Sequence, residues 1–160
     1  MTNPFPFTGG NILNASDLNA IGEVESYTPS FAAGVTVGNG TLLGRYVRIN
    51  DLVVSWAYFQ LGSTSAITGD VSVSVPVSIT SGGGVEVAAG TECYFIDLST
   101  GGRWLGMARD SSGDNVLLRY PKQSGAAALA LFAQPLSSTA PFTWTTSDFI
   151  VWHHTYRVNT

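Results

Sequence analysis

The sequence alternates between polar and apolar residues over short stretches, and this period of two restricts the chain to β-strands. The clearest stretch runs from Asp70 to Val75, where polar residues and valines follow one another until Pro76. Successive side chains of a strand point to opposite faces, so the pattern predicts one wet and one dry face. Proline ends such a strand because it cannot donate a ladder hydrogen bond.

Similar stretches follow one another at short spacing, separated by turn residues. Gly101-Gly102, Asn50-Asp51 and the segment from Ser111 to Asp114 favour tight turns. Many short strands without a long helix predict an all-β fold, an antiparallel β-sandwich or a jelly-roll-like barrel. The Ala-Leu composition of one expected strand, 127–132, also suits a turn of helix. The expected strands are Tyr46–Ile49, Leu52–Leu61, Asp70–Val75, Cys93–Leu98, Arg103–Arg109, Asn115–Tyr120, Ala127–Phe132 and Phe149–Val158.

Length and charge narrow the function classes. The 160 residues correspond to one domain, and only 11% of them are charged, where about 25% is usual. The net charge of −4 argues against nucleic acid, because phosphate binding needs a stripe of cations. The first cation is Arg45 and the longest apolar run is eight residues, so we expect neither a signal peptide nor a membrane span. The single cysteine, Cys93, is expected to be a small buried thiol.

Two of the expected strands are apolar on both faces. In Leu52–Leu61, one face carries Leu52, Val54, Trp56 and Tyr58, and the other face is equally apolar. Phe149–Val158 repeats this arrangement. A two-layer sandwich buries only one face of each sheet, so the second face needs another cover.

We expect a neighbouring subunit to bury the second apolar face of these strands. The alternative is that the chain's own loops and N-terminal segment bury it. A low-charge chain with a mean hydropathy of +0.19 is easiest to explain as a tightly assembled oligomer. We predict an oligomer with Val53, Phe59, Phe149 and Val151 at the contact between subunits.

The first 26 residues differ from the rest, and we expect them to form a separate anchoring segment before a β-domain at 27–160. Asn14 can cap a short helix, Leu13 before it would pack on Leu18, and Leu18 and Ile21 would form the apolar edge of the helix. A helix of about eight residues is unstable alone in water, so it needs another surface to pack on.

No cluster of residues in the sequence gives a strong indication of catalysis or of metal binding. His153 and His154 are adjacent in a strand, so their imidazoles point to opposite faces and cannot chelate one metal from one chain. A three-fold axis could collect one histidine per chain, but no second type of ligand is near. The Asp110–Asp114 segment lacks the ligand spacing of a calcium loop and is expected to be a polar hairpin tip. No hydrolase or phosphate-binding motif is present, and no pair of acids stands out. We therefore expect neither an enzyme nor a cofactor or metal.

Two aromatic residues lie beside polar turns. Trp104 follows Gly101-Gly102, and Tyr120 precedes Pro121-Lys122. Sugars are often recognised by a rigid aromatic face flanked by hydrogen-bonding groups, which makes both residues candidates for receptor contact. The alternative is that both are ordinary half-buried strand residues.

The segment from Gly10 to Asn19, GNILNASDLN, resembles the Gly-x-x-Leu-Thr-Ala-x-Asp-Leu-Asn segment near the start of many bacteriophage tail and appendage proteins. The later segments from Tyr27 to Phe31, Val37 to Thr41 and Gly44 to Val53 are similar to a β-rich domain of phage minor tail and fibre proteins. The similarity covers residues 10–79, and the rest only in general character.

This resemblance implies a virion structural protein with a homotrimeric β-domain, bound through its N-terminal segment to other virion proteins on the tail or capsid. The expected function is a short tail fibre or knob that contacts a host surface glycan or protein. Shaft repeats and coiled-coil heptads, which long fibres carry, are absent from the sequence. The competing functions are a decoration protein that binds no receptor and a short polysaccharide depolymerase whose site lies between subunits.

Overall fold

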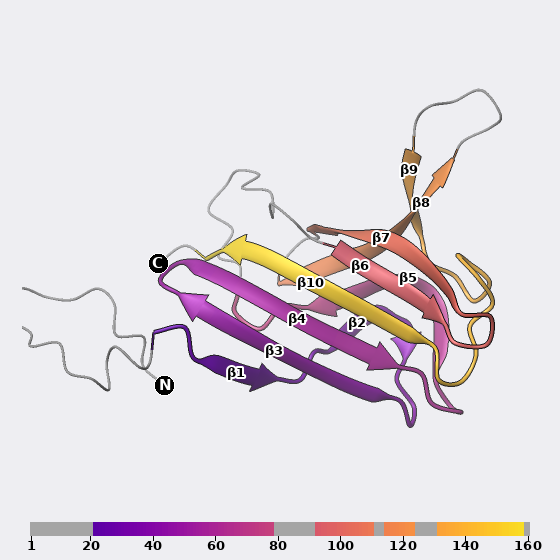
Figure 1. Cartoon of the computed structure of the whole chain (residues 1–160), viewed down its shortest axis with the longest axis horizontal. Helices are drawn as coiled ribbons and strands as arrows, with labels where there is room; N and C mark the ends of the chain where they lie inside the picture. Colours follow the sequence, from indigo (N-terminus) through magenta and orange to yellow (C-terminus); the bar gives the residue numbers. More distant parts are fainter. Residues whose placement is uncertain (1–20, 79–91, 111–113, 124–130, 159–160) are drawn as a thin grey trace, which may run out of the picture.

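The computed structural model describes residues 21–78, 92–110, 114–123 and 131–158, and all the strands in these ranges are paired antiparallel (Figure 1). The all-β prediction is confirmed, and no helix occurs in the described ranges. The predicted N-terminal helix, with Leu13 and Leu18, lies outside them, while Ile21 is half-buried in the turn before β1. The strands are β1 (Val24–Tyr27), β2 (Phe31–Thr36), β3 (Thr41–Ile49), β4 (Leu52–Gln60), β5 (Ala66–Ser74), β6 (Glu92–Asp97), β7 (Gly102–Asp110), β8 (Asn115–Gln123), β9 (Leu131–Pro135) and β10 (Phe149–Arg157).

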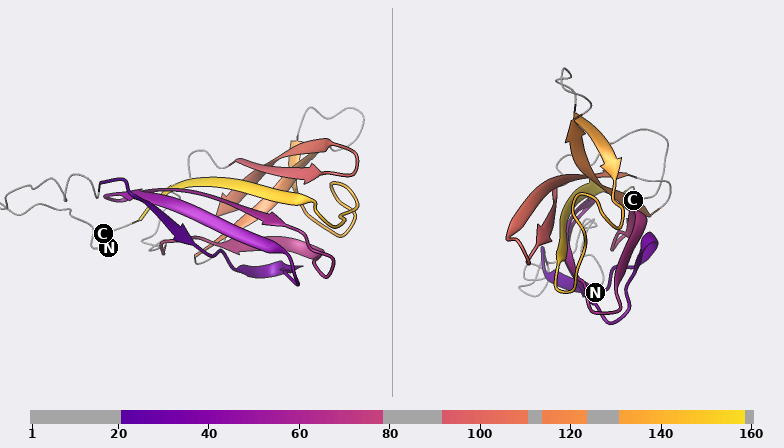
Figure 2. Two further views of the ribbon diagram at one scale, coloured as in Figure 1. Left: turned by 60° about the horizontal axis from the view of Figure 1, so that its bottom comes forward. Right: turned by 90° about the vertical axis from the view of Figure 1, so that its right-hand side faces the viewer.

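These strands form one hydrogen-bonded sheet in the order β1-β3-β4-β10-β6-β7-β8-β5-β2, with β9 paired to β8 beside this path. The sheet curls into a half-barrel, so that β2 and β5 face β4 and β10 across the interior (Figure 2). The ring of Phe31 on β2 lies 5.2 Å from Phe59 and 6.2 Å from Trp152. Two separate sheets, as a sandwich would have, are not found among the described strands.

β4 pairs with β10 over nine residues, from Leu52 opposite Arg157 to Gln60 opposite Phe149. β3 joins β4 through the predicted turn at Asn50 and Asp51. Asn50 has a φ of 57°, a left-handed conformation that asparagine tolerates better than most residues. The predicted boundary between residues 26 and 27 falls inside β1, so the described sheet begins before it.

The core fills the concave side of the curled sheet. Its largest members come from neighbouring strands: Phe59, Phe95 and Trp152, with Val71 and Leu118 from the facing wall. Cys93 is fully buried among them, as predicted, and burial raises the pKa of its thiol to about 12. The thiol is therefore protonated at neutral pH and has a packing role.

Asp97 organises the turn between β6 and β7. Its carboxylate accepts hydrogen bonds from the backbone N–H and the hydroxyl group of both Ser99 and Thr100, at 2.6–3.1 Å. These bonds, led by the Ser99 side chain, lower the pKa of Asp97 because they favour the charged carboxylate. Gly101 completes the turn with a φ of 73°, as the Gly-Gly pair predicted.

The Asp97 turn makes stability depend on acid pH. A carboxyl group whose pKa is lower in the folded chain stabilises that chain above its unfolded pKa of 3.8 and loses this effect as the pH falls through the folded pKa. We expect Asp97→Asn to have a lower free energy of unfolding than the wild type at pH 6. Between about pH 4 and pH 2, where the wild-type carboxylate becomes protonated, the variant should lose less of this free energy than the wild type does. Urea unfolding across this range measures both slopes, and parallel slopes would contradict the assignment.

Candidate functional site

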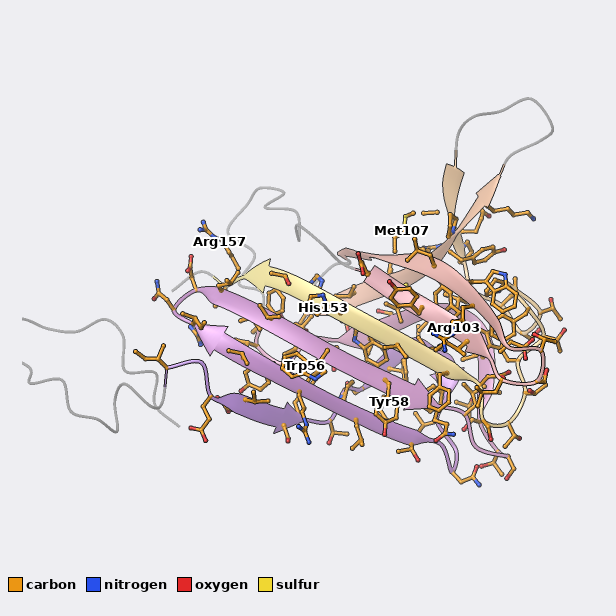
Figure 3. The ribbon with its side chains drawn as sticks, viewed as in Figure 1. Trp56, Tyr58, Arg103, Met107, His153 and Arg157 are labelled. Atoms are coloured by element: carbon orange, nitrogen blue, oxygen red, sulfur yellow. The ribbon has the colours of Figure 1, made fainter. Side chains whose placement is uncertain are left out.

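The convex side of the sheet carries a broad apolar surface, which we call the outer face. It consists of the side chains of β3, β4, β10, β6 and β7 that point away from the core, among them Trp56 and Tyr58 (Figure 3). Leu43 is 53% exposed and Leu105 is 57% exposed, which is unusual for leucine on a soluble domain's sheet. The larger apolar members are Leu43, Trp56, Tyr58, Tyr94, Ile96, Leu105, Met107, Phe149 and Val151.

Strand register places these side chains in rows that cross the sheet. One row is apolar in all five strands and consists of Leu43, Tyr58, Val151, Tyr94 and Leu105. At about 4.8 Å per strand spacing, this row is about 19 Å long. Directly opposed residues share a face of the sheet, so the row forms a continuous apolar ridge.

The adjacent row combines aromatic and charged groups. It runs through Arg45, Trp56, His153, Glu92 and Met107 on the same five strands. Arg45 and Glu92 are three strand spacings apart, about 14 Å, which is too far for an ion pair within one chain. The outer face therefore presents a cation and an anion on either side of an aromatic centre.

The structure divides the four predicted contact residues between the two faces. Phe149 and Val151 lie on the outer face, half-buried by their neighbours. Val53 and Phe59 are 0% exposed and belong to the core. For these two the prediction was wrong, because the sheet curls toward their side and leaves Trp56 and Tyr58 outside.

The two aromatic candidates for receptor contact both point into the molecule. Trp104 is half-buried, and its ring stacks on Phe142 with the centroids 4.5 Å apart. Tyr120 is half-buried and packs against the core. Both rings pack against the core, which fits the alternative of half-buried strand residues.

The adjacent histidines point to opposite faces, as predicted. His153 is exposed on the outer face (Figure 3), and His154 is buried with its ring stacked 4.8 Å from that of Tyr156. In the part of the chain that the structure describes, no three His, Cys, Asp or Glu side chains lie close enough to hold a metal. The same part contains no helix with the length and hydropathy needed to cross a membrane.

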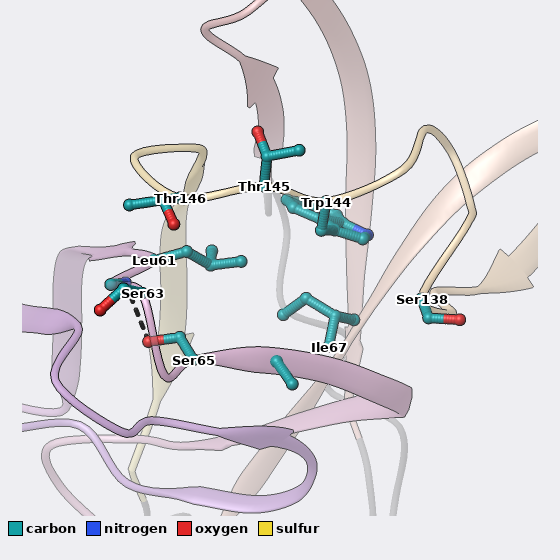
Figure 4. A pocket seen from close by; sticks show the side chains of 10 residues that line it. Leu61, Ser63, Ser65, Ile67, Ser138, Trp144, Thr145 and Thr146 are labelled. Carbon is teal, nitrogen blue, oxygen red and sulfur yellow. Dashed lines mark hydrogen bonds between the residues drawn. The ribbon is translucent and has the colours of Figure 1, made fainter.

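A pocket lies at the end of the sheet where β4 ends and β5 and β10 begin (Figure 4). Its volume is about 370 Å³, within the usual range for small-ligand sites. Trp144 and Ile67 lie on opposite sides of it in this view. The lining residues carry no charge: Leu61, Gly62, Ser63, Ser65, Ala66, Ile67, Ser138, Trp144, Thr145 and Thr146.

One wall of the pocket is held by Asp148, whose side chain is fully buried. Its carboxylate accepts hydrogen bonds from the backbone N–H of Leu98 at 3.0 Å and of Thr145 at 2.6 Å, and from the Thr145 hydroxyl at 3.1 Å. The indole N–H of Trp144 donates to the carbonyl oxygens of Ser137 and Ala140. The loop that carries Trp144 is thus fixed from both sides.

The other wall, the turn between β4 and β5, is held by Asn39. The side-chain oxygen of Asn39 accepts hydrogen bonds from the backbone N–H and the hydroxyl of Thr64, both at 2.9 Å, and its amide donates to the Ser63 hydroxyl at 3.1 Å. Ser65 donates to the carbonyl of Val37. Sequence reasoning missed this pocket, because no spacing in the sequence links residues 61–67 to 138–146.

Searches of family models, of curated proteins and of solved structures find no match to this chain. The resemblance to phage tail proteins therefore rests on the sequence segments quoted above. The functional argument rests on the outer face and the pocket.

The buried carboxylate of Asp148 is expected to be essential for the pocket wall. Asp148→Ala leaves the N–H groups of Leu98 and Thr145 without their acceptor, and each such loss costs about 1–3 kcal/mol. We expect a loss of about 3 kcal/mol in the free energy of unfolding, measured by urea denaturation. Glu23→Ala, at an exposed position before β1, is the control and should change stability by less than about 0.5 kcal/mol. A loss at Asp148 no larger than that of the control would contradict the role.

Proposed function

We propose that this chain is a structural subunit of a bacteriophage particle, a short trimeric tail fibre or knob that attaches the virion to the host surface. The phage particle comes from the resemblance of residues 10–79 to tail and fibre proteins. The observation that carries the assembly is the outer face, an apolar surface that extends over five strands of a chain with few charges. Monomeric proteins rarely expose such a surface, and interfaces between identical subunits are rich in aromatic residues and Met. Identical copies of the chain are therefore the partners that we expect to bury the outer face.

The directions of the strands support the attachment role. β1 begins and β10 ends at one end of the sheet, at the left in Figure 1, whereas the pocket lies at the opposite end. A chain anchored through its N-terminal segment would point the pocket away from the particle. We keep the jelly-roll-like sandwich as part of this proposal, since the two walls of the curled sheet already face each other as layers do.

Charge complementarity supports a second copy as the occupant of the outer face. Arg45 and Glu92 lie on either side of Trp56 and His153 in one row. Around a three-fold axis, the Arg45 side of each copy's outer face can meet the Glu92 side of its neighbour's outer face, which brings the apolar rows together near the axis. Such pairing favours a single orientation of the subunits.

Charge reversal tests this contact. We expect Arg45→Glu and Glu92→Arg each to weaken self-association about tenfold, equal to about 1.4 kcal/mol, because each places like charges together. The double variant should regain most of the loss, since the pair is restored with its signs exchanged. Light scattering over a concentration series gives the oligomeric state and its affinity.

Lys122→Glu, an exposed cation reversed on β8 outside the outer face, is the matched control and should leave association unchanged. A wild-type chain that stays monomeric at micromolar concentration would refute assembly through the outer face. A stable trimer whose affinity is unchanged by both charge reversals would show that the subunits do not contact one another through Arg45 and Glu92.

A competition assay for phage adsorption distinguishes the host-attachment function from the decoration function. We expect the soluble protein to compete with phage that carries it for binding to host cells, because receptor contact belongs to the domain itself. Removing residues 1–20 leaves β1 intact, and the truncated protein should still compete but no longer incorporate into particles. Incorporation without competition by either form would favour the decoration function.

A further inference from the structure

The pocket at the end of the sheet is built like a ligand site, and its lining indicates the class of ligand. Nearly all of its polar groups are hydroxyls, and no acid, lysine, arginine or histidine lines it. An ionic ligand would lose its hydration there without gaining a counter-charge. A neutral ligand rich in hydroxyl groups suffers no such cost.

The apolar part of the pocket suits the C–H face of a sugar ring. Trp144 is half-buried, and its own N–H is already used within the loop, so the ring contributes apolar surface. Phe95 and Phe142 support the indole at centroid distances of 6.0 and 4.3 Å. A rigid aromatic surface of this kind binds at a low cost in side-chain entropy.

The polar part is provided by hydroxyl groups at exposed positions around the pocket. Ser63, Ser138 and Thr146 are all exposed (Figure 4). A hydroxyl group both donates and accepts, which matches the alternating requirements of a sugar's own hydroxyls. The two walls are fixed by Asp148 and Asn39, so little ordering is needed when a ligand binds.

We propose that this pocket binds an uncharged sugar residue of a host surface glycan. The proposal rests on the attachment function above and assigns it a site distinct from Trp104 and Tyr120. The pocket volume of about 370 Å³ accommodates one sugar ring, and the pocket is partly open to solvent, so the neighbouring sugars of a glycan can lie outside it. Affinity for one site is expected to be about 1 mM.

Saturation-transfer difference NMR on the full-length oligomer tests this inference, since it detects weak ligands on large proteins. The probes are the methyl glycosides of glucose, galactose, mannose, rhamnose and N-acetylglucosamine, with N-acetylneuraminic acid as the charged comparison. We expect saturable transfer to at least one neutral glycoside and none to the acid. No saturable transfer to any neutral probe, or a preference for the acid, would overturn the proposal.

Variants locate the binding. Thr146→Arg fills the open side of the pocket and should weaken binding at least tenfold, while Thr143→Arg, exposed on the same loop but not lining the pocket, should leave it unchanged. Equal binding by Thr146→Arg and wild type would show that the sugar binds elsewhere.

The same variants distinguish failure of this inference from failure of the proposed function. A Thr146→Arg protein that remains trimeric and competes fully for host adsorption would refute the pocket and leave attachment standing. A wild-type protein that binds sugar in the pocket but never competes with phage would refute attachment instead.

Discussion

The pairing of β4 with β10 is the constraint on which the rest of the structure depends. Nine opposed residues fix the register, and a slip by one would turn the core side chains of one of the two strands to the outer face. The concave face supplies Phe59 and Trp152 to the core, so the convex face must present Trp56 and Tyr58 to the outside. Core and outer face are therefore two consequences of one register.

The sequence predicts the positions of these two strands well, but it does not show which face of each strand is buried. Alternation and turn residues locate β4, β10 and the turn at Asn50 and Asp51 within a residue or two. Both faces of β4 are apolar, so hydropathy alone cannot tell which one a single chain buries. The choice is made by the curl of the sheet, which brings Phe31 of β2 onto Phe59. This is a contact between segments that no local pattern reveals.

The other differences between the sequence predictions and the structure also come from contacts between residues far apart in the sequence. β2 lacks a clean period of two, because register shifts near Ala33 interrupt its pairing with β5. Trp104 points inward because Phe142, far along the chain, provides a stacking partner. The pocket depends on Asp148 and Asn39, whose side chains fix backbone segments that are separate in sequence. Short-range patterns identify strands and turns, whereas sites made by loops of different strands require the fold.

The outer face and the pocket occupy different parts of the molecule, and this separation matters for the proposed function. A second copy on the broad convex face leaves the end of the sheet open, so assembly and ligand binding do not compete for the same residues. In the proposed trimer, three pockets would face one direction on a rigid body. Each site is expected to bind with only millimolar affinity, but simultaneous engagement raises avidity by a factor of about 10² to 10⁴ without any new contact. A shallow, uncharged pocket is then sufficient for attachment, provided that the apolar face holds the copies together.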